Sequence, residues 1–404
     1  MNKPRYFSLA DAGDFLGWLN APGSKRLDDL AGTDIYVLVG LSTLGRQELA
    51  APIQVELGSG PVSGFAQAVG LPQAVAGTER RAAREPDRSV TLARFRRQQA
   101  EEIDALSLDI ARLMAGQPGG GAVEAIRYVI VELLRNVIQH SEDRFGGVVA
   151  AQIIDRPGVS RRVQVAVADA GIGIFAALTN RLLHPGIVDV QTALQKALHP
   201  HFSGTFREGE TGTFENAGLG LYVLSELAKM TGGSFLLASR GDALLLRDLS
   251  AARDRAVFLD SNGFAGTLVV FECVLEALAD FKALFAAIID KARLQRPQRI
   301  SSGVVRFVDE PPPEATRFLI AVASEDTSKA VEFARATLLP RVSSGAAVAL
   351  DFRNWAVFSQ SYLHALLYLP VRIAWATKTP IYVLHAAPVV RSAIEWIESY
   401  ALVG

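Results

Sequence analysis

A long amphipathic helix followed by apolar strands constrains the fold of residues 122–274 more than any other pattern in the chain. From Ala122 to His140 apolar residues recur three to four positions apart, which predicts a helix with one apolar stripe. Two strands, a second helix and a further strand are expected after it, at Val148–Ile154, Val163–Val167, Leu219–Met230 and Thr267–Val274. Helices and strands mixed in this way predict an α/β fold, an α+β sandwich in which helices pack on a sheet.

The composition indicates a chain with a large buried core. Hydrophobic residues make up 50% of the 404 residues and charged residues 21%. The 41 Lys and Arg residues nearly balance the 42 Asp and Glu residues, so overall charge does not indicate nucleic-acid binding. The single cysteine, Cys273, excludes an intrachain disulfide and suits a reducing compartment. With neither a signal-peptide pattern nor ~20 uninterrupted apolar residues, the chain is expected to be cytoplasmic and not to contact a membrane.

Three regions follow one another along the chain. Residues 1–90 form a small N-terminal α/β region without a chemical motif, in which Ile35–Val39 is expected to be a buried strand. Residues 91–280 carry the motifs described next, and a helical pattern is predicted over Thr91–Met114. Strand-like and helical runs alternate over residues 298–404, which predicts a small α/β domain there.

The first motif lies on the long helix, where Glu132, Asn136 and His140 stand four residues apart. At 100° per residue they form a polar line beside the apolar stripe. A carboxylate and an amide at the border of a core are costly to bury unless something pairs with them. Three solvated polar residues are the alternative interpretation.

The second motif is an apolar strand that ends at Asp169 and continues through Gly171 and Gly173. A carboxylate at a strand end can accept a hydrogen bond from an amino group, and glycines let the backbone approach a flat or phosphorylated ligand. An ordinary Asp-Gly turn is the alternative. In the third motif Gly218, Leu219 and Gly220 open a predicted helix, whose N–H groups and dipole favour anions; a helix start without a ligand is the alternative there.

In this order the three motifs resemble the signature of the GHKL ATPases. This superfamily includes gyrase-type topoisomerases, the ninety-kilodalton heat-shock chaperones, histidine kinases and mismatch-repair ATPases, and its ATP site is called the Bergerat fold. The resemblance covers about residues 97–276. It implies ATP and Mg²⁺ as cofactors: Asn136 would coordinate the metal, Glu132 would be the general base, and Asp169 would accept a hydrogen bond from the adenine amino group.

The resemblance also implies roles for the remaining motif residues. Gly171 and Gly173 would line the base, and Gly218, Leu219 and Gly220 would lie at the phosphates. Thr267 resembles the strand threonine that assists adenine binding. The irregular stretch from Ile174 to Ala217 would be the lid that covers the nucleotide.

Two further resemblances bear on the branch of the superfamily. A histidine four residues after the asparagine, at His140, is similar to the helix of the anti-sigma-factor serine kinases, and no histidine precedes it as the phosphoacceptor of a sensor kinase. Residues 317–401 resemble a STAS-like domain, the anti-sigma-antagonist fold. Its phosphoacceptor position falls on Gln360, so docking or regulation is expected of it rather than phosphorylation.

The resemblance therefore implies a Mg²⁺-dependent ATP hydrolase whose nucleotide state switches lid conformation and partner contacts, docked or regulated through the STAS-like domain. A protein serine/threonine kinase is the alternative, and a nucleotide-sensing scaffold that does not hydrolyse ATP is a second one. The partner is expected to be another protein, or a second copy of the chain when ATP binds. The sequence neither indicates nor excludes nucleic acid as a partner.

Overall fold

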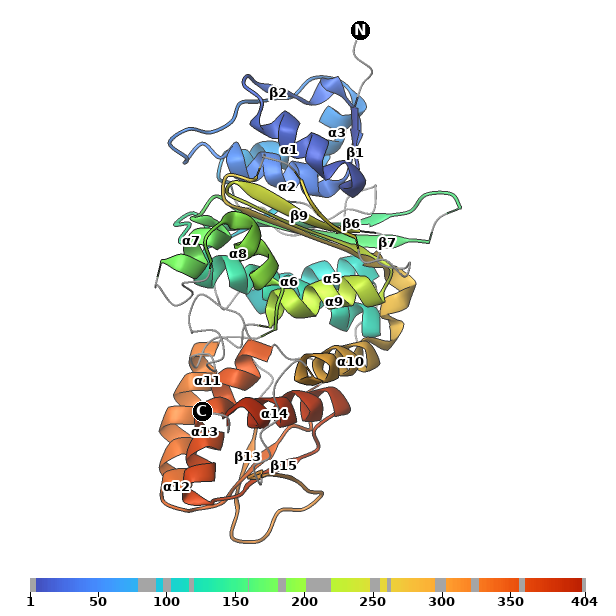
Figure 1. Cartoon of the computed structure of the whole chain (residues 1–404). Coiled ribbons are helices and arrows are strands. Elements are labelled where there is room, and N and C mark those ends of the chain that lie inside the picture. The colour runs from blue at the N-terminus through green and yellow to red at the C-terminus, as the bar shows by residue number, and fades with distance from the viewer. Residues whose placement is uncertain are drawn as a thin grey trace. The chain divides into compact units, whose positions relative to one another are not determined.

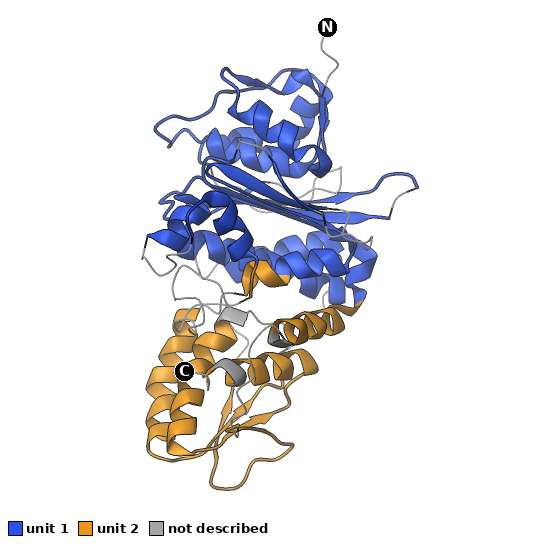
Figure 2. Ribbon diagram, viewed as in Figure 1, with its two compact units in different colours: residues 1–198, 224–279 blue, residues 199–223, 280–404 orange. Residues whose placement is uncertain are grey.

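The chain forms two compact units in the computed structural model (Figure 2). They comprise residues 1–198 with 224–279, and residues 199–223 with 280–404. The structure describes residues 5–78, 92–96, 103–115, 120–158, 160–180, 187–200, 219–247, 255–259, 263–294, 303–320, 327–355 and 360–401.

A seven-stranded antiparallel sheet lies at the centre of the first unit (Figure 1), with the strand order β10-β9-β8-β11-β7-β6-β5. The strands are β5 (Ala93–Phe95), β6 (Gly147–Ile154), β7 (Arg162–Asp169), β8 (Ser234–Ser239), β9 (Asp242–Arg247), β10 (Arg255–Phe258) and β11 (Thr267–Val274). The long strands β7 and β11 pair along their whole length, from Asp169 opposite Thr267 to Arg162 opposite Val274. This register fixes which residues of the two strands are neighbours.

Helices cover one face of this sheet. They are α5 (Ile103–Ala115), α6 (Gly121–His140) and α9 (Gly220–Met230), drawn on the same side of the sheet in Figure 1. α5 and α6 pack on each other, and α6 packs on β7 through the apolar stripe that the sequence predicts. Two shorter helices, α7 (Gly173–Thr179) and α8 (Val190–Ala197), contact β8 and β9.

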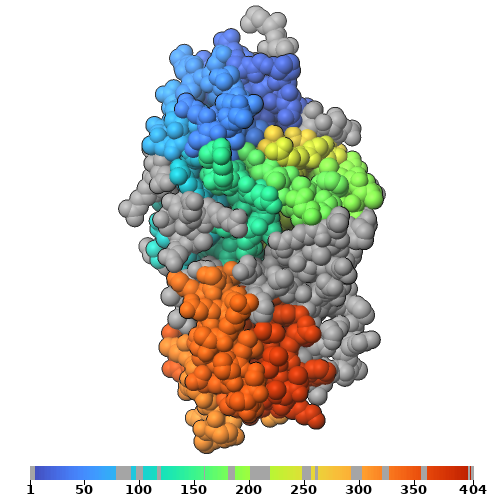
Figure 3. All heavy atoms as spheres, turned by 90° about the vertical axis from the view of Figure 1, so that its left-hand side faces the viewer, coloured from blue at the N-terminus to red at the C-terminus, as the bar shows by residue number. Residues whose placement is uncertain are grey.

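The N-terminal segment covers the opposite face of the sheet. Its elements are β1 (Arg5–Phe7), α1 (Ala12–Asn20), β2 (Lys25–Arg26), β3 (Leu30–Thr33), α2 (Ile35–Leu44), β4 (Val55–Glu56), α3 (Pro61–Ala68) and α4 (Leu71–Val75). α2 packs on β6 and β7, and one core cluster joins it to alternate residues of the sheet such as Ala166 and Ala168. Figure 3 shows the blue surface of this segment adjoining the green surface of the residues that follow. The sheet is thus buried on both faces.

The expected strand at Ile35–Val39 is wrong, because these residues begin helix α2. All ten residues of α2 are buried, with the sheet on one side and other N-terminal helices such as α4 on another. A helix that is apolar all round has no periodic stripe, so its sequence cannot be told from that of a buried strand.

Two further expectations need correction. The continuous helix over Thr91–Met114 is wrong in its first part, since Ala93–Phe95 form β5, which pairs with β6, and α5 begins at Ile103. The stretch from Ile174 to Ala217 is not irregular throughout, because it contains most of α7 and all of α8. Residues 181–186 and 201–217 of that stretch lie outside the described residues.

The second unit contains a four-stranded parallel sheet with the order β12-β15-β14-β13. Its strands are β12 (Val305–Phe307), β13 (Thr316–Leu319), β14 (Val348–Asp351) and β15 (Ile381–Leu384). Its helices are α10 (Phe281–Leu294), α11 (Thr327–Phe333), α12 (Leu339–Ser343), α13 (Gln360–Thr377) and α14 (Pro388–Ala401), with a π-helical turn at Ala334–Leu338. This alternation confirms the mixed α/β character expected of the C-terminal region. Within the described part of the chain, none of the helices is both long and apolar enough to span a bilayer.

Candidate nucleotide site

Helix α6 places two of the predicted site residues at the edge of the core. Glu132 is buried (3% exposed), and Asn136, one turn later, is half-buried. The Nδ2 atom of Asn136 is buried and has no hydrogen-bond partner among the described residues. A buried amide group without a partner costs ~1–3 kcal/mol, so a ligand that satisfies it is favoured. Rotation of the amide would present its oxygen instead, the atom type that Mg²⁺ prefers.

Asp169 lies at the end of β7 and is also buried (3% exposed). Its carboxylate accepts hydrogen bonds from the backbone N–H of Gly171, at 2.8 Å to Oδ1, and from that of Thr267, its cross-strand neighbour. Burial raises the pKa of Asp169 to about 7, the nearby Asp143 carboxylate adds to the rise, and the two N–H groups oppose it. The structure therefore brings Asp169, Gly171 and Thr267 together, and their role at the adenine stays a prediction.

The local backbone geometry requires glycine at two positions after Asp169, Gly171 and Gly173. A Cβ atom on Gly171 would lie 2.0 Å from the backbone oxygen of Ser141, which follows α6. Gly173 has φ of +80°, a conformation that disfavours any side chain, and begins α7. The sequence attributed both glycines to approach of a ligand; the structure shows that close packing against Ser141 demands the first of them.

A buried ion pair behind this loop is a feature that sequence reasoning missed. Arg46, which follows α2 and is completely buried, contacts Asp143 with 2.6 Å between Nη2 and Oδ2. The same Oδ2 accepts a hydrogen bond from the N–H of Ala170, at 2.8 Å. Arg46 also donates to the backbone oxygen of Gly146, at 2.8 Å. The N-terminal segment thus holds the residue next to Asp169 through one arginine and one carboxylate.

The residues expected at the phosphates are described only in part. Gly218 lies outside the described residues, Leu219 is buried, and Gly220 is the first residue of α9. Their role at the phosphates stays a prediction. The described residues contain no group of three or more His, Cys, Asp or Glu side chains able to hold a metal ion. A Mg²⁺ ion held by Asn136 would accordingly take its other ligands from water and the nucleotide phosphates.

The raised pKa of Asp169 predicts a pH-dependent cost of folding. In the unfolded chain this carboxyl ionises near pH 4, whereas the folded protein keeps its proton until about pH 7. Stability is therefore lost as pH rises from about 4 to about 7, by ~1.4 kcal/mol per unit of pKa difference at most. In the absence of nucleotide, the Tm of the unmodified protein should fall between pH 5 and pH 8. We expect the Tm of Asp169→Asn to fall by several degrees less over the same range.

Thermal unfolding of both proteins across that range measures the effect. Asp29→Asn, at an exposed carboxylate of the same unit, is the matched control and should follow the unmodified protein. Parallel pH profiles for Asp169→Asn and the unmodified protein would contradict the assigned ionisation.

Comparison with known families supports the nucleotide site. Residues 121–243 match the family described as histidine kinase-, DNA gyrase B-, and HSP90-like ATPase. No match was found among curated proteins or among solved structures. The matched segment contains Glu132, Asn136 and Asp169, and Thr267 lies beyond it in sequence but beside Asp169 in the sheet. The match therefore supports a GHKL-type ATP-binding domain at residues 121–243.

Proposed function

We propose that the protein is a Mg²⁺-dependent ATP hydrolase whose nucleotide state changes its contacts with a partner. The observation that carries the proposal is the carboxylate of Asp169, buried beside Thr267 in a domain that matches the ATPase family. A buried carboxylate is costly unless donors surround it, and two N–H groups already do so. The exocyclic amino group of adenine would supply a further donor.

The residues of α6 take separate roles in this proposal. Asn136 holds Mg²⁺, which when bound neutralises charge on the phosphates. Glu132 accepts a proton from the attacking water, and its burial places that carboxylate out of bulk solvent. Gly218, Leu219 and Gly220 receive the phosphates at the start of α9. Binding and turnover therefore depend on different side chains.

The other parts of the chain act on this domain or extend it. The segment from Ile174 to Ala217 serves as the lid, and its helix α8 is tied to β9 by a 2.7 Å hydrogen bond from Gln191 to Asp242. Residues 298–404, proposed to form a STAS-like domain, serve for docking or regulation. The partner is another protein, or a second copy of the chain when ATP is bound.

A protein serine/threonine kinase of the anti-sigma-factor type is the second candidate. The observation that favours it is His140, the last residue of α6, which stands four residues beyond Asn136. Such a kinase would use Glu132 to accept the proton of a serine or threonine hydroxyl in place of that of water. The two candidates differ in the acceptor of the phosphoryl group.

The products formed from ATP separate the candidates. The full chain is incubated with γ-labelled ATP and Mg²⁺, alone and with candidate partner proteins, and free phosphate is measured beside labelled protein. We expect free phosphate, and loss of the reaction on chelation of Mg²⁺. Labelled serine or threonine would support the kinase instead, and ATP binding without either product would leave a sensing scaffold.

Asn136→Ala tests the metal ligand within the same experiment. We expect its affinity for ATP in Mg²⁺ to fall at least tenfold, or ~1.4 kcal/mol, because the ion loses its protein ligand. Equilibrium binding with and without Mg²⁺ measures this. An affinity that stays unchanged in Mg²⁺ would contradict the role of Asn136, and failure of the unmodified chain to bind ATP would contradict the proposed function as a whole.

A further inference from the structure

A cavity lies on the face of the sheet opposite α6. Its volume is about 360 Å³, and it separates the N-terminal segment from the sheet. The N-terminal side contributes residues 8–10 and Asp34, and the sheet contributes Ser234, Leu245, Arg247 and Glu272 among others. Side chains alternate between the faces of a strand, so Glu272 of β11 points away from the face that carries Thr267. The cavity is therefore distinct from the nucleotide site.

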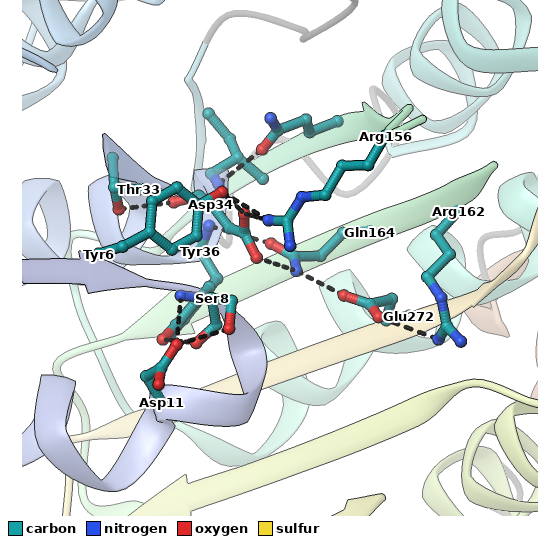
Figure 4. Close-up of polar contacts among 12 residues, drawn as sticks. Tyr6, Ser8, Asp11, Thr33, Asp34, Tyr36, Arg156, Arg162, Gln164 and Glu272 are labelled. Carbon is teal, nitrogen blue, oxygen red and sulfur yellow. Dashed lines mark hydrogen bonds and ion pairs between the residues drawn. The ribbon is translucent and has the colours of Figure 1, made fainter. Parts of the chain in front are cut away.

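Polar groups gather in this cavity, between layers that are otherwise apolar. Figure 4 shows Asp34 and Glu272 joined through Gln164, whose Nε2 donates to Glu272 at 2.9 Å and to Asp34 at 3.5 Å. Two arginines line the cavity beside the two carboxylates. Arg156 lies 3.4 Å from Asp34 and Arg162 lies 3.2 Å from Glu272. Each carboxylate thus has one arginine as its counter-charge.

A third arginine of the cavity, Arg247, has no such counter-charge among the described residues. Arg247, the last residue of β9, lines the cavity on the same strand face as Leu245. It is half-buried, and its Nε atom is buried without a hydrogen-bond partner among the described residues. No carboxylate of the described residues pairs with it, unlike Arg156 and Arg162. A guanidinium taken partly out of water costs free energy unless an acceptor meets it.

The two carboxylates of the cavity restrict which kind of ligand can supply the acceptor group for Arg247. With Asp34 and Glu272 neutralised by their own arginines, Arg247 leaves about one surplus positive charge among the described residues that line the cavity. A polyanion such as a nucleoside triphosphate would bring several negative charges to a single surplus positive charge, and most of them would be left uncompensated. A hydroxyl or amino group on the ligand would instead donate to them.

We propose that this cavity binds a small organic molecule with one carboxylate or phosphate group, which the guanidinium of Arg247 receives. The planar guanidinium offers two parallel N–H donors to either group. A volume of about 360 Å³ lies at the lower end of the range of ligand pockets, so the ligand is of metabolite size. This second site uses strands β7 and β11, which also carry Asp169 and Thr267.

Binding of simple anions to the full chain tests the proposal. Sodium lactate, which has one carboxylate and one hydroxyl, and inorganic phosphate are titrated by calorimetry and by thermal unfolding, with sodium chloride at equal ionic strength as the reference. We expect saturable binding of at least one of them. At a concentration tenfold above its Kd, Tm should rise by roughly 3 °C. Whichever anion binds identifies the group that the site receives.

Matched variants locate the binding. In Arg247→Gln we expect Kd to rise at least tenfold, with Arg247→Lys between this variant and the unmodified protein. Ser234→Phe keeps every charge and fills the cavity, so it should also abolish binding. If Arg247→Gln does not fold, the result for Ser234→Phe shows whether the anion binds in this cavity. The titrations are repeated with saturating ADP, which should leave the anion's Kd unchanged because the nucleotide occupies another site.

Three results would overturn the proposal. One is the absence of saturable binding by both anions. Another is equal binding to Arg247→Gln or Ser234→Phe and to the unmodified protein. The third is displacement of the anion by ADP, which would place it in the nucleotide pocket. None of these results bears on ATP turnover, so the proposed function is tested separately.

Discussion

Replacing Glu132 by glutamine is expected to lower product formation from ATP by about 10²–10⁴-fold, the usual contribution of a general base. Glutamine has the same shape and can hydrogen-bond, but it cannot accept the proton of the attacking group. The residue lies in the middle of α6 and is buried, so the neutral side chain also avoids any cost of burying a charge. Affinity for ATP should stay within about threefold, because other residues hold the phosphates and the adenine ring in the proposed site.

Single-turnover reactions with labelled ATP and excess protein measure this loss, and equilibrium binding measures the affinity. Glu124→Gln is the matched control, since Glu124 lies two turns earlier on the same helix and is also buried. It should turn over ATP at the normal rate. A Glu132→Gln protein that keeps more than about a tenth of the rate would contradict the assignment of the base, whichever product is formed.

Truncating Arg46 to alanine is expected to destabilise the first unit by about 3–5 kcal/mol. Its removal leaves the carboxylate of Asp143 buried without its counter-charge, and such a change costs more than the pair contributes. The expected fall in Tm is roughly 10 °C, from ~2–4 °C per kcal/mol. The affinity for ATP should fall as well. Without Arg46, Asp143 holds the backbone N–H of Ala170 less firmly, and Ala170 is the residue next to Asp169.

Thermal unfolding and ATP binding are measured on Arg46→Ala and on two comparison variants. The double variant Arg46→Met with Asp143→Asn removes both charges and should recover part of the stability. Arg26→Ala breaks an exposed pair with Glu56, whose side chains are 63% and 55% exposed, and should change Tm by no more than about 2 °C. A Tm for Arg46→Ala equal to that of Arg26→Ala would show that the buried pair stabilises nothing.

The elements that the sequence predicted well are those with a visible contrast between apolar and polar residues. Helix α6 is buried nearly all round between Tyr128 and Arg135, but Glu132, Asn136 and His140 form a polar line beside its apolar stripe, and this contrast is visible in the sequence. Helix α2 has no such contrast, since all its residues are buried, and so it was taken for a strand. Strand β5 has three residues, too few to show any period.

The site was predictable where its residues follow one another along short segments. Asp169 and Gly171 belong to one turn, and their contact is local. Arg46 and Asp143 are 97 residues apart, and nothing around Arg46 indicates a partner at that distance. Arg247 was missed for the same reason, because the cavity that it lines is closed by residues near the N-terminus. Contacts between distant segments depend on the fold, which the local sequence does not specify.

Because both faces of the sheet are covered, insertions and deletions within its strands have a predictable consequence. Gln164 and Asp169 lie on opposite faces of β7, and a one-residue deletion between them would turn every side chain beyond it to the other face. The Asp169 carboxylate would then point into the apolar layer under α2. We expect neither insertions nor deletions to be tolerated within β7 or β11. A label or a fused domain should instead be placed after α4 or before β12, where neither strand's register is affected.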